Sequence, residues 1–158
     1  MRTEYDDIRF TTNFSMGEMM KSAFFPEVAA AMKPEEYHKQ NMFLLAVLIL
    51  QPVRTYFNMI INVDSGLRID GLNGLVGGST TSLHPEGKAV DIYPDDRSNL
   101  RDIFFYIKDE LRGRWGELKY VENVNGGFIH VALRHFGKEP FCSATYIDGS
   151  VEYFKVLE

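Results

Sequence analysis

The pattern of apolar and polar positions along the chain predicts helices first and strands later. A short helix is expected over residues 15–23, because Ser15 and Glu18 have the spacing of a capping box. Residues 34–57 predict a longer helix with one apolar side, and Pro52 should kink it or mark a restart. The Ala-rich stretch between these two helices contains prolines and indicates a connection or a broken helix.

The rest of the chain is rich in short β-branched and aromatic segments separated by turn formers, which is typical of strands. Residues 98–111 interrupt them with apolar residues at helical spacing, and Asp148–Gly149 predicts a β-hairpin near the C-terminus. Strands are expected at residues 59–63, 88–93, 118–122, 128–134, 144–147 and 151–156. This order of elements favours the α+β class, in a single domain over residues 1–158, rather than alternating βαβ units.

The composition is that of an ordinary globular protein, with 45% hydrophobic and 25% charged residues. The formal net charge of −5 argues against a nucleic-acid partner, because no surplus of basic residues exists to neutralise phosphates. Cys142 is the only cysteine, which excludes an intramolecular disulfide and a cysteine-rich zinc site. A metal would therefore need histidine and carboxylate ligands.

No membrane segment is expected. The longest apolar run, residues 42–50, is too short to cross a bilayer, and the N-terminus lacks the apolar region of a secretory signal. We expect a protein that is made in the cytoplasm, has no membrane partner and works as a monomer.

The residues that could bind a metal are concentrated in residues 82–91 and in one later strand. Asp91 lies among Ala, Val and Ile, where a carboxylate is costly unless a cation or several donors meet it. His84 stands in a turn just before it, and His130 interrupts a second apolar strand. Two imidazoles and one carboxylate are a ligand set that zinc accepts. Taken separately, Asp91 could instead cap a turn and His130 could be a satisfied core histidine.

These residues resemble the zinc peptidases typified by D-Ala-D-Ala carboxypeptidases, the peptidase M15 family. The string Ser-x-His-x-x-Gly-x-Ala-x-Asp matches residues 82–91, and an aromatic-Ile-His-Val strand follows about forty residues later. The Hedgehog signalling domain has a similar metal loop, and the resemblance to short phage and bacterial members runs over residues 13–135. It implies a Hedgehog/DD-peptidase-like fold, with N-terminal helices packed on a mainly antiparallel sheet and one zinc site.

The resemblance also implies roles for single residues. One Zn²⁺ per chain would be held by His84, Asp91 and His130. Arg68 matches an arginine that binds the scissile carbonyl or the substrate carboxylate, although it could be a loop arginine paired with Asp64 or Asp70. Ser82 matches a serine near the substrate, with turn capping as the alternative.

The general base departs from the commoner pattern. Many members have a glutamate three residues before the last ligand, where this chain has Gly127. The best substitute is Glu122, because related members carry a glutamate set further back, although Glu122 could also be a solvated strand end. Some members place another histidine two residues before the last ligand, and this chain has Phe128 there.

The function implied by the resemblance is zinc-dependent hydrolysis of peptidoglycan stem peptides, by a D-Ala-D-Ala carboxypeptidase or an endopeptidase. Glu122 would take a proton from water, and Arg68 would help to stabilise the oxyanion. A phage endolysin that reaches the cell wall after release or delivery is one expected setting. The alternative is a catalytically inactive, zinc-bearing binding or structural domain of the same fold, which Gly127 and Phe128 favour.

Overall fold

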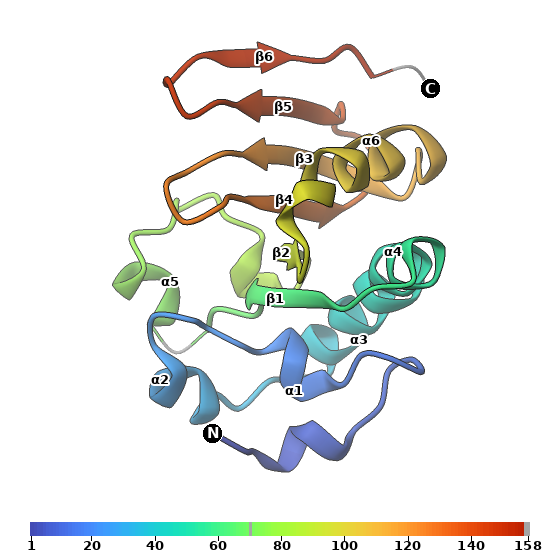
Figure 1. The fold of residues 1–158 in the computed structure, drawn as a ribbon. Helices are drawn as coiled ribbons and strands as arrows, with labels where there is room; N and C mark the ends of the chain where they lie inside the picture. Colours follow the sequence, from blue (N-terminus) through green and yellow to red (C-terminus); the bar gives the residue numbers. More distant parts are fainter. Residues whose placement is uncertain (70, 157–158) are drawn as a thin grey trace.

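A six-stranded sheet forms the centre of the computed structural model, which describes residues 1–69 and 71–156 (Figure 1). The strand order is β1-β2-β4-β3-β5-β6, and every neighbouring pair is antiparallel except β3 and β5. The strands are β1 (Ile61–Ser65), β2 (Ala89–Pro94), β3 (Trp115–Val121), β4 (Phe128–Leu133), β5 (Phe141–Thr145) and β6 (Val151–Tyr153). The predicted α+β fold with a mainly antiparallel sheet is confirmed.

Helices precede the sheet and also interrupt it. Helix α6 packs on β3 and β4, and α3 contacts β2 and β4, while β6 and the N-terminal segment lie at opposite ends of the molecule (Figure 1). The α-helices are α1 (Met16–Met19), α2 (Pro26–Ala30), α3 (Glu36–Leu45), α4 (Gln51–Phe57), α5 (Leu72–Leu75) and α6 (Leu100–Glu110). Shorter helical segments are η1 (Glu4–Asp7), η2 (Ala46–Leu50), η3 (His84–Glu86) and η4 (Arg97–Asn99).

The capping box that opens α1 is present as predicted. The Ser15 hydroxyl accepts from the Glu18 N–H at 3.2 Å, and the Glu18 carboxylate accepts from the Ser15 N–H at 2.8 Å. The helix ends earlier than expected, because the chain then turns to pair with β1. There the Ala23 N–H donates to Asp64 O at 3.0 Å.

The predicted long helix is present as the consecutive segments α3, η2 and α4, and Pro52 marks the restart. Proline has no N–H, so the carbonyl of Leu48, four residues earlier, loses its usual helical partner. Arg114 compensates from outside the helix, since its Nη1 donates to Leu48 O at 3.0 Å. The turn before the proline is π-helical over Ala46–Leu50.

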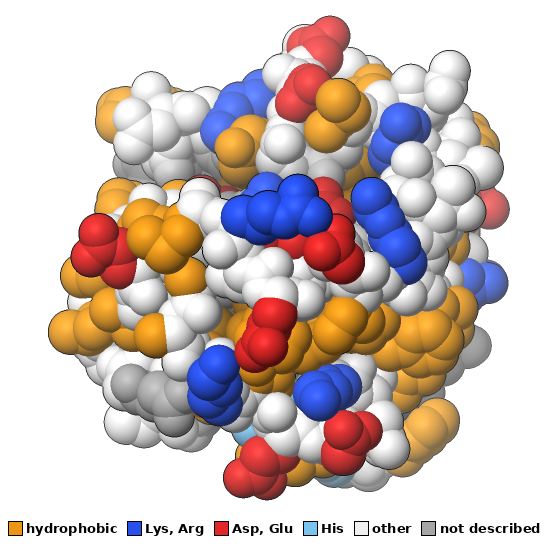
Figure 2. Space-filling view, turned by 90° about the horizontal axis from the view of Figure 1, so that it is seen from below, with side chains coloured by type: hydrophobic (Ala, Val, Ile, Leu, Met, Phe, Trp, Pro, Cys, Tyr) orange, Lys and Arg blue, Asp and Glu red, His pale blue; other side chains and the backbone are white. Residues whose placement is uncertain are grey.

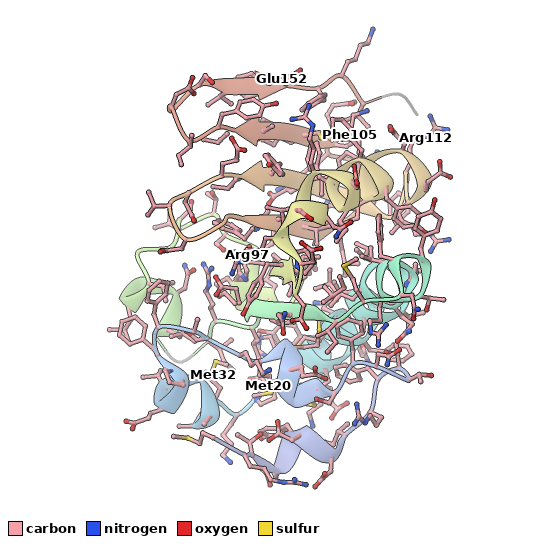
Figure 3. All side chains as sticks on the ribbon, viewed as in Figure 1. Met20, Met32, Arg97, Phe105, Arg112 and Glu152 are labelled. Carbon is pink, nitrogen blue, oxygen red and sulfur yellow. The ribbon has the colours of Figure 1, made fainter. Side chains whose placement is uncertain are left out.

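The apolar side of α6 and the N-terminal methionines belong to one hydrophobic core. Leu100, Ile103, Phe104 and Ile107 are buried on α6, as their helical spacing predicted. Met20 and Met32, labelled beside α1 and α2 in Figure 3, are also buried.

Charged side chains of both signs are interspersed on the surface. On the face seen in Figure 2, basic side chains lie beside acidic ones and apolar atoms lie between them. Among the described residues, no helix combines the length and the apolar character that crossing a membrane requires.

The hydrogen bond from Arg114 to Leu48 can be tested by mutation. Arg114→Met should lower the free energy of unfolding by about 1 kcal/mol, because the Leu48 carbonyl then loses its donor. Denaturant unfolding followed by circular dichroism measures this difference. In a Pro52→Ala background, the alanine N–H restores a helical donor, so Arg114→Met should cost less. An equal cost in both backgrounds would show that Arg114 acts in another way.

Candidate metal centre

The register of the sheet places Asp91 and His130 beside each other. Asp91 in β2 pairs with His130 in β4, and directly opposed side chains have Cβ atoms about 4.5–5.5 Å apart. His130 Nδ1 consequently lies 2.9 Å from Asp91 Oδ1. The polar residues that interrupt two apolar strands therefore meet at one point of the sheet.

His84 reaches the same carboxylate oxygen from the η3 turn. Its Nε2 lies 3.3 Å from Asp91 Oδ1, and the side chain is buried. The turn is fixed by the Arg68 N–H, which donates to His84 O at 3.1 Å. Gly87 closes the turn with a φ of +73°, and a Cβ at this position would lie 2.9 Å from His38 O. A residue larger than glycine would therefore strain the turn that carries His84.

The three side chains form a donor set that fits zinc. One ligand atom from each lies within 4.8 Å of the others. The remaining ring nitrogens are also held: His84 Nδ1 lies 2.8 Å from Gly66 O, and His130 Nε2 lies 2.9 Å from Glu117 Oε1. Metal-binding histidines commonly donate their second nitrogen to a carbonyl or carboxylate, which fixes the tautomer. The structure therefore offers a metal His84 Nε2, Asp91 Oδ1 and His130 Nδ1.

Asp91 is buried but surrounded by donors. Arg68 Nη2 donates to Asp91 Oδ2 at 3.1 Å, while Oδ1 faces both histidines. Burial alone would raise the pKa of Asp91, but the hydrogen bonds from His130 and His84 outweigh burial and lower the pKa below its ordinary value. The carboxylate is therefore ionised at neutral pH, as a metal ligand must be.

Arg68 lies at the site, where it is tied to neighbouring side chains. Its guanidinium donates to Ser65 Oγ at 2.8 Å, Asn73 Oδ1 at 3.4 Å and Asp91 Oδ2 at 3.1 Å. Its ion pair is with Asp91 rather than with the expected alternative Asp64, and Asp70 lies outside the described residues. In this arrangement Arg68 positions Asp91, a candidate metal ligand, and its role in binding substrate stays a prediction.

A pocket of about 290 Å³ opens beside the three ligands. Ser79, Thr81 and Ser82 contribute hydroxyl groups to its lining, and Val121 and Phe128 contribute apolar surface. The Ser82 hydroxyl also accepts from the His84 N–H at 3.2 Å. Ser82 therefore caps the turn and lines the pocket, and its role near a substrate stays a prediction.

The structure places Glu122 away from the metal ligands. Glu122 follows Tyr120 by two residues and lies on the same side of the sheet, where the Tyr120 ring packs against Phe104 of α6. Tyr120 Oη donates to Glu122 Oε2 at 3.1 Å, and the Ile147 N–H donates to Oε1 at 3.3 Å. The Glu122 carboxylate therefore has its partners outside the pocket, whose lining does not include Glu122, and its role as the general base stays a prediction.

Glu117 is the carboxylate that the sequence analysis missed. The strand containing it begins at Trp115 instead of near residue 118, so Glu117, Lys119 and Val121 share the face that lines the pocket. Glu117 is half-buried and its Oε1 meets His130 Nε2. The alternation of side chains along a strand could have identified Glu117. A predicted strand that began one residue earlier would have placed Glu117 on the same face as Lys119.

Gly127 shows why the commoner glutamate position is not used here. Its φ is +82°, in the left-handed region, and a Cβ at this position would collide with the backbone oxygen of Val121. A glutamate at residue 127 would therefore require a different turn between β3 and β4.

One zinc ion per chain is expected at this centre, and removing it should lower the melting temperature. Zinc at 100 times its dissociation constant stabilises the folded state by about 2.7 kcal/mol, which corresponds to roughly 5–10 °C for a domain of this size. Because Asp91 keeps Arg68 and both histidines as partners, the metal-free protein should remain folded. Metal analysis and thermal unfolding with and without chelator measure both effects. Identical melting after verified zinc removal would contradict the coupling.

Zinc binding should also release a proton near neutral pH. Burial alone would lower the pKa of His130, but the hydrogen bonds to Asp91 and Glu117 outweigh it and raise the pKa above its ordinary value. A metal ligand must give up this proton, so zinc affinity should fall as the pH falls through the raised pKa. Calorimetry in buffers of different ionisation enthalpy counts the released protons. An affinity independent of pH between about 6 and 8 would count against this linkage.

Similarity to known proteins covers most of the chain, including the whole of the site. The profile of the family described as Peptidase M15 matches residues 12–132, which contain His84, Asp91 and His130. The comparison with curated proteins gives no match. The family match spans far more than half of the chain and encloses a cluster that can hold a metal. The chain therefore belongs to the peptidase M15 family, a family of metallopeptidases.

Proposed function

We propose that this protein is a zinc-dependent peptidase that hydrolyses the stem peptides of peptidoglycan. Membership of the M15 family supports metallopeptidase chemistry. The observation that carries the proposal is the cluster of His84, Asp91 and His130 in the lining of a pocket. Three protein ligands are the number typical of catalytic zinc sites, which keep a position for water or substrate.

When bound, a zinc ion supplies a Lewis acid that polarises a carbonyl oxygen and lowers the pKa of water to roughly 7. The chain supplies the groups that hold and orient the ligands. Gly66 O and Glu117 Oε1 fix the two imidazole rings, and Arg68 fixes the Asp91 carboxylate. These contacts prepare the ligand set before substrate arrives.

Glu117 is the carboxylate best placed to move a proton. Its Oε1 meets His130 Nε2, and a carboxylate has further acceptor sites, so Oε2 can accept a proton from the attacking water. The same oxygen can then pass the proton to the leaving amine. The hydrogen bond with His130 lowers the pKa of Glu117 below its ordinary value, so Glu117 is ionised and able to accept at neutral pH.

The pocket lining suits a peptide substrate. Ser79, Thr81 and Ser82 offer hydroxyl groups that can both donate to a carbonyl and accept from an amide N–H. Val121 and Phe128 offer apolar surface for small side chains such as the methyl group of alanine. Both the terminal D-Ala-D-Ala bond of a carboxypeptidase and an internal L-Ala-D-Glu bond of an endopeptidase present such groups.

A zinc-bearing binding domain without hydrolysis is the second candidate. One observation favours it: among the described residues that line the pocket, Glu117 is the only carboxylate besides Asp91, and it is already bonded to His130. Incubation of the zinc-loaded protein with purified peptidoglycan, with and without chelator, separates the two functions. Soluble fragments that appear only without chelator support the peptidase, and retention on peptidoglycan without fragments supports the binding domain.

Glu117→Gln should reduce peptide hydrolysis by about two to four orders of magnitude, because the base is lost while the shape of the side chain is kept. Rates are measured at saturating zinc, with metal content verified for each variant. Glu122→Gln is the matched control, since it makes the same change on the other side of the sheet, and it should hydrolyse at nearly the unmutated rate. The reverse result, loss with Glu122→Gln and full activity with Glu117→Gln, would assign the base to Glu122.

A further inference from the structure

Lys119 is a cation in the pocket that neither the ligand set nor the proton transfer uses. It lies on β3 directly opposite His130 of β4, and its side chain lines the pocket between those of Glu117 and Val121. Its Nζ stands 5.6 Å from the centre of the Phe141 ring on neighbouring β5. The side chain is therefore held on the open side of the sheet, next to the metal ligands.

The two cations of the pocket have different surroundings. Arg68 is only 12% exposed at its side chain and donates to Ser65, Asn73 and Asp91. In the part of the chain that the structure describes, the Lys119 ammonium has no ion pair or hydrogen bond; it lies over the Phe141 ring, and its charge helps to lower the pKa of neighbouring Glu117. An ammonium group has three donors, so Lys119 can bind an anion without first breaking a salt bridge.

The charge of the loaded pocket favours an anion. Its charged side chains are Arg68 and Lys119 against Asp91 and Glu117, so a divalent cation leaves a surplus of positive charge. This local surplus contrasts with the formal net charge of −5 for the whole chain. A partly enclosed positive site attracts a negatively charged ligand group more strongly than an exposed surface charge does.

We propose that Lys119 binds a carboxylate of the substrate, the one carried by the residue whose amine leaves when the peptide bond is cut. This assignment rests on the proposed peptidase function and names the feature of the substrate that the pocket selects. Both candidate bonds have this carboxylate next to the leaving amine, in the terminal D-Ala of one stem peptide and in the α-carboxylate of D-Glu in the other. Arg68, in contrast, holds Asp91 in place.

The test compares matched pairs of peptides. One pair ends in D-Ala-D-Ala as the free acid or as the C-terminal amide. The other contains L-Ala-D-Glu with its α-carboxyl group free or as the α-amide. Hydrolysis is followed by chromatography, and binding to the zinc-loaded protein by calorimetry. The pair that the unmutated protein discriminates identifies the source of the carboxylate.

Lys119→Met should weaken binding and raise KM for the free acid roughly 10- to 100-fold, the size expected for a lost hydrogen bond to a charged group. It should leave the amide almost unchanged, so the preference for the acid disappears. Lys119→Arg keeps the charge and should keep most of the preference. Lys155→Met is the matched control, because it removes one positive charge beside α6, outside the metal pocket.

The outcomes separate this inference from the proposed function. An unmutated protein that binds the acid better than the amide through Lys119, but hydrolyses neither, would retain the carboxylate site and refute the peptidase. A protein that hydrolyses peptides and loses acid and amide binding equally in Lys119→Met would retain the peptidase and overturn the role of Lys119. Equal binding of acid and amide by the unmutated protein would also overturn it.

Discussion

The burial of the Asp91 carboxylate in the middle of the sheet is the constraint on which the site depends. A buried charge is tolerated only when donors or cations compensate it, and here the donors come from three separate parts of the chain. His130 approaches across the sheet, His84 from the η3 turn, and Arg68 from the loop after β1. The two oxygens of the Asp91 carboxylate have different partners: Oδ1 faces the two histidines, and Oδ2 accepts from the Arg68 guanidinium.

The N-terminal segment takes part in this arrangement through backbone contacts. Gly66, whose carbonyl meets His84 Nδ1, receives its own fixed position because its N–H donates to Lys21 O at 2.9 Å. The next N–H, that of Leu67, donates to Met19 O at 2.9 Å. The orientation of one proposed metal ligand therefore depends on the end of the capped helix α1 and on the residues just after it, far from His84 in sequence.

The order of helices and strands predicted the fold class, and the resemblance to zinc peptidases predicted that His84, Asp91 and His130 lie together, which they do. Asp91 and His130 are polar residues in apolar strands, and such residues need partners that can be sought elsewhere in the chain. The carboxylate beside His130 was missed because the predicted strand began at residue 118, whereas β3 begins at Trp115, so Glu117 was not assigned to the strand face that carries Lys119. The partner of Leu48 was beyond prediction, since Arg114 is brought to it only by the completed fold.

Glu117 contacts the His130 ring with one carboxylate oxygen, as Asp91 does, but at the other ring nitrogen. One oxygen of each carboxylate meets the imidazole, at 2.9 Å in both cases, which leaves the second oxygen for a different task. In Asp91 that second oxygen is neutralised by Arg68 and cannot serve as a base. Glu117 is half-buried, lines the pocket and retains acceptor capacity, so orientation of His130 and acceptance of a proton do not compete for the same atom.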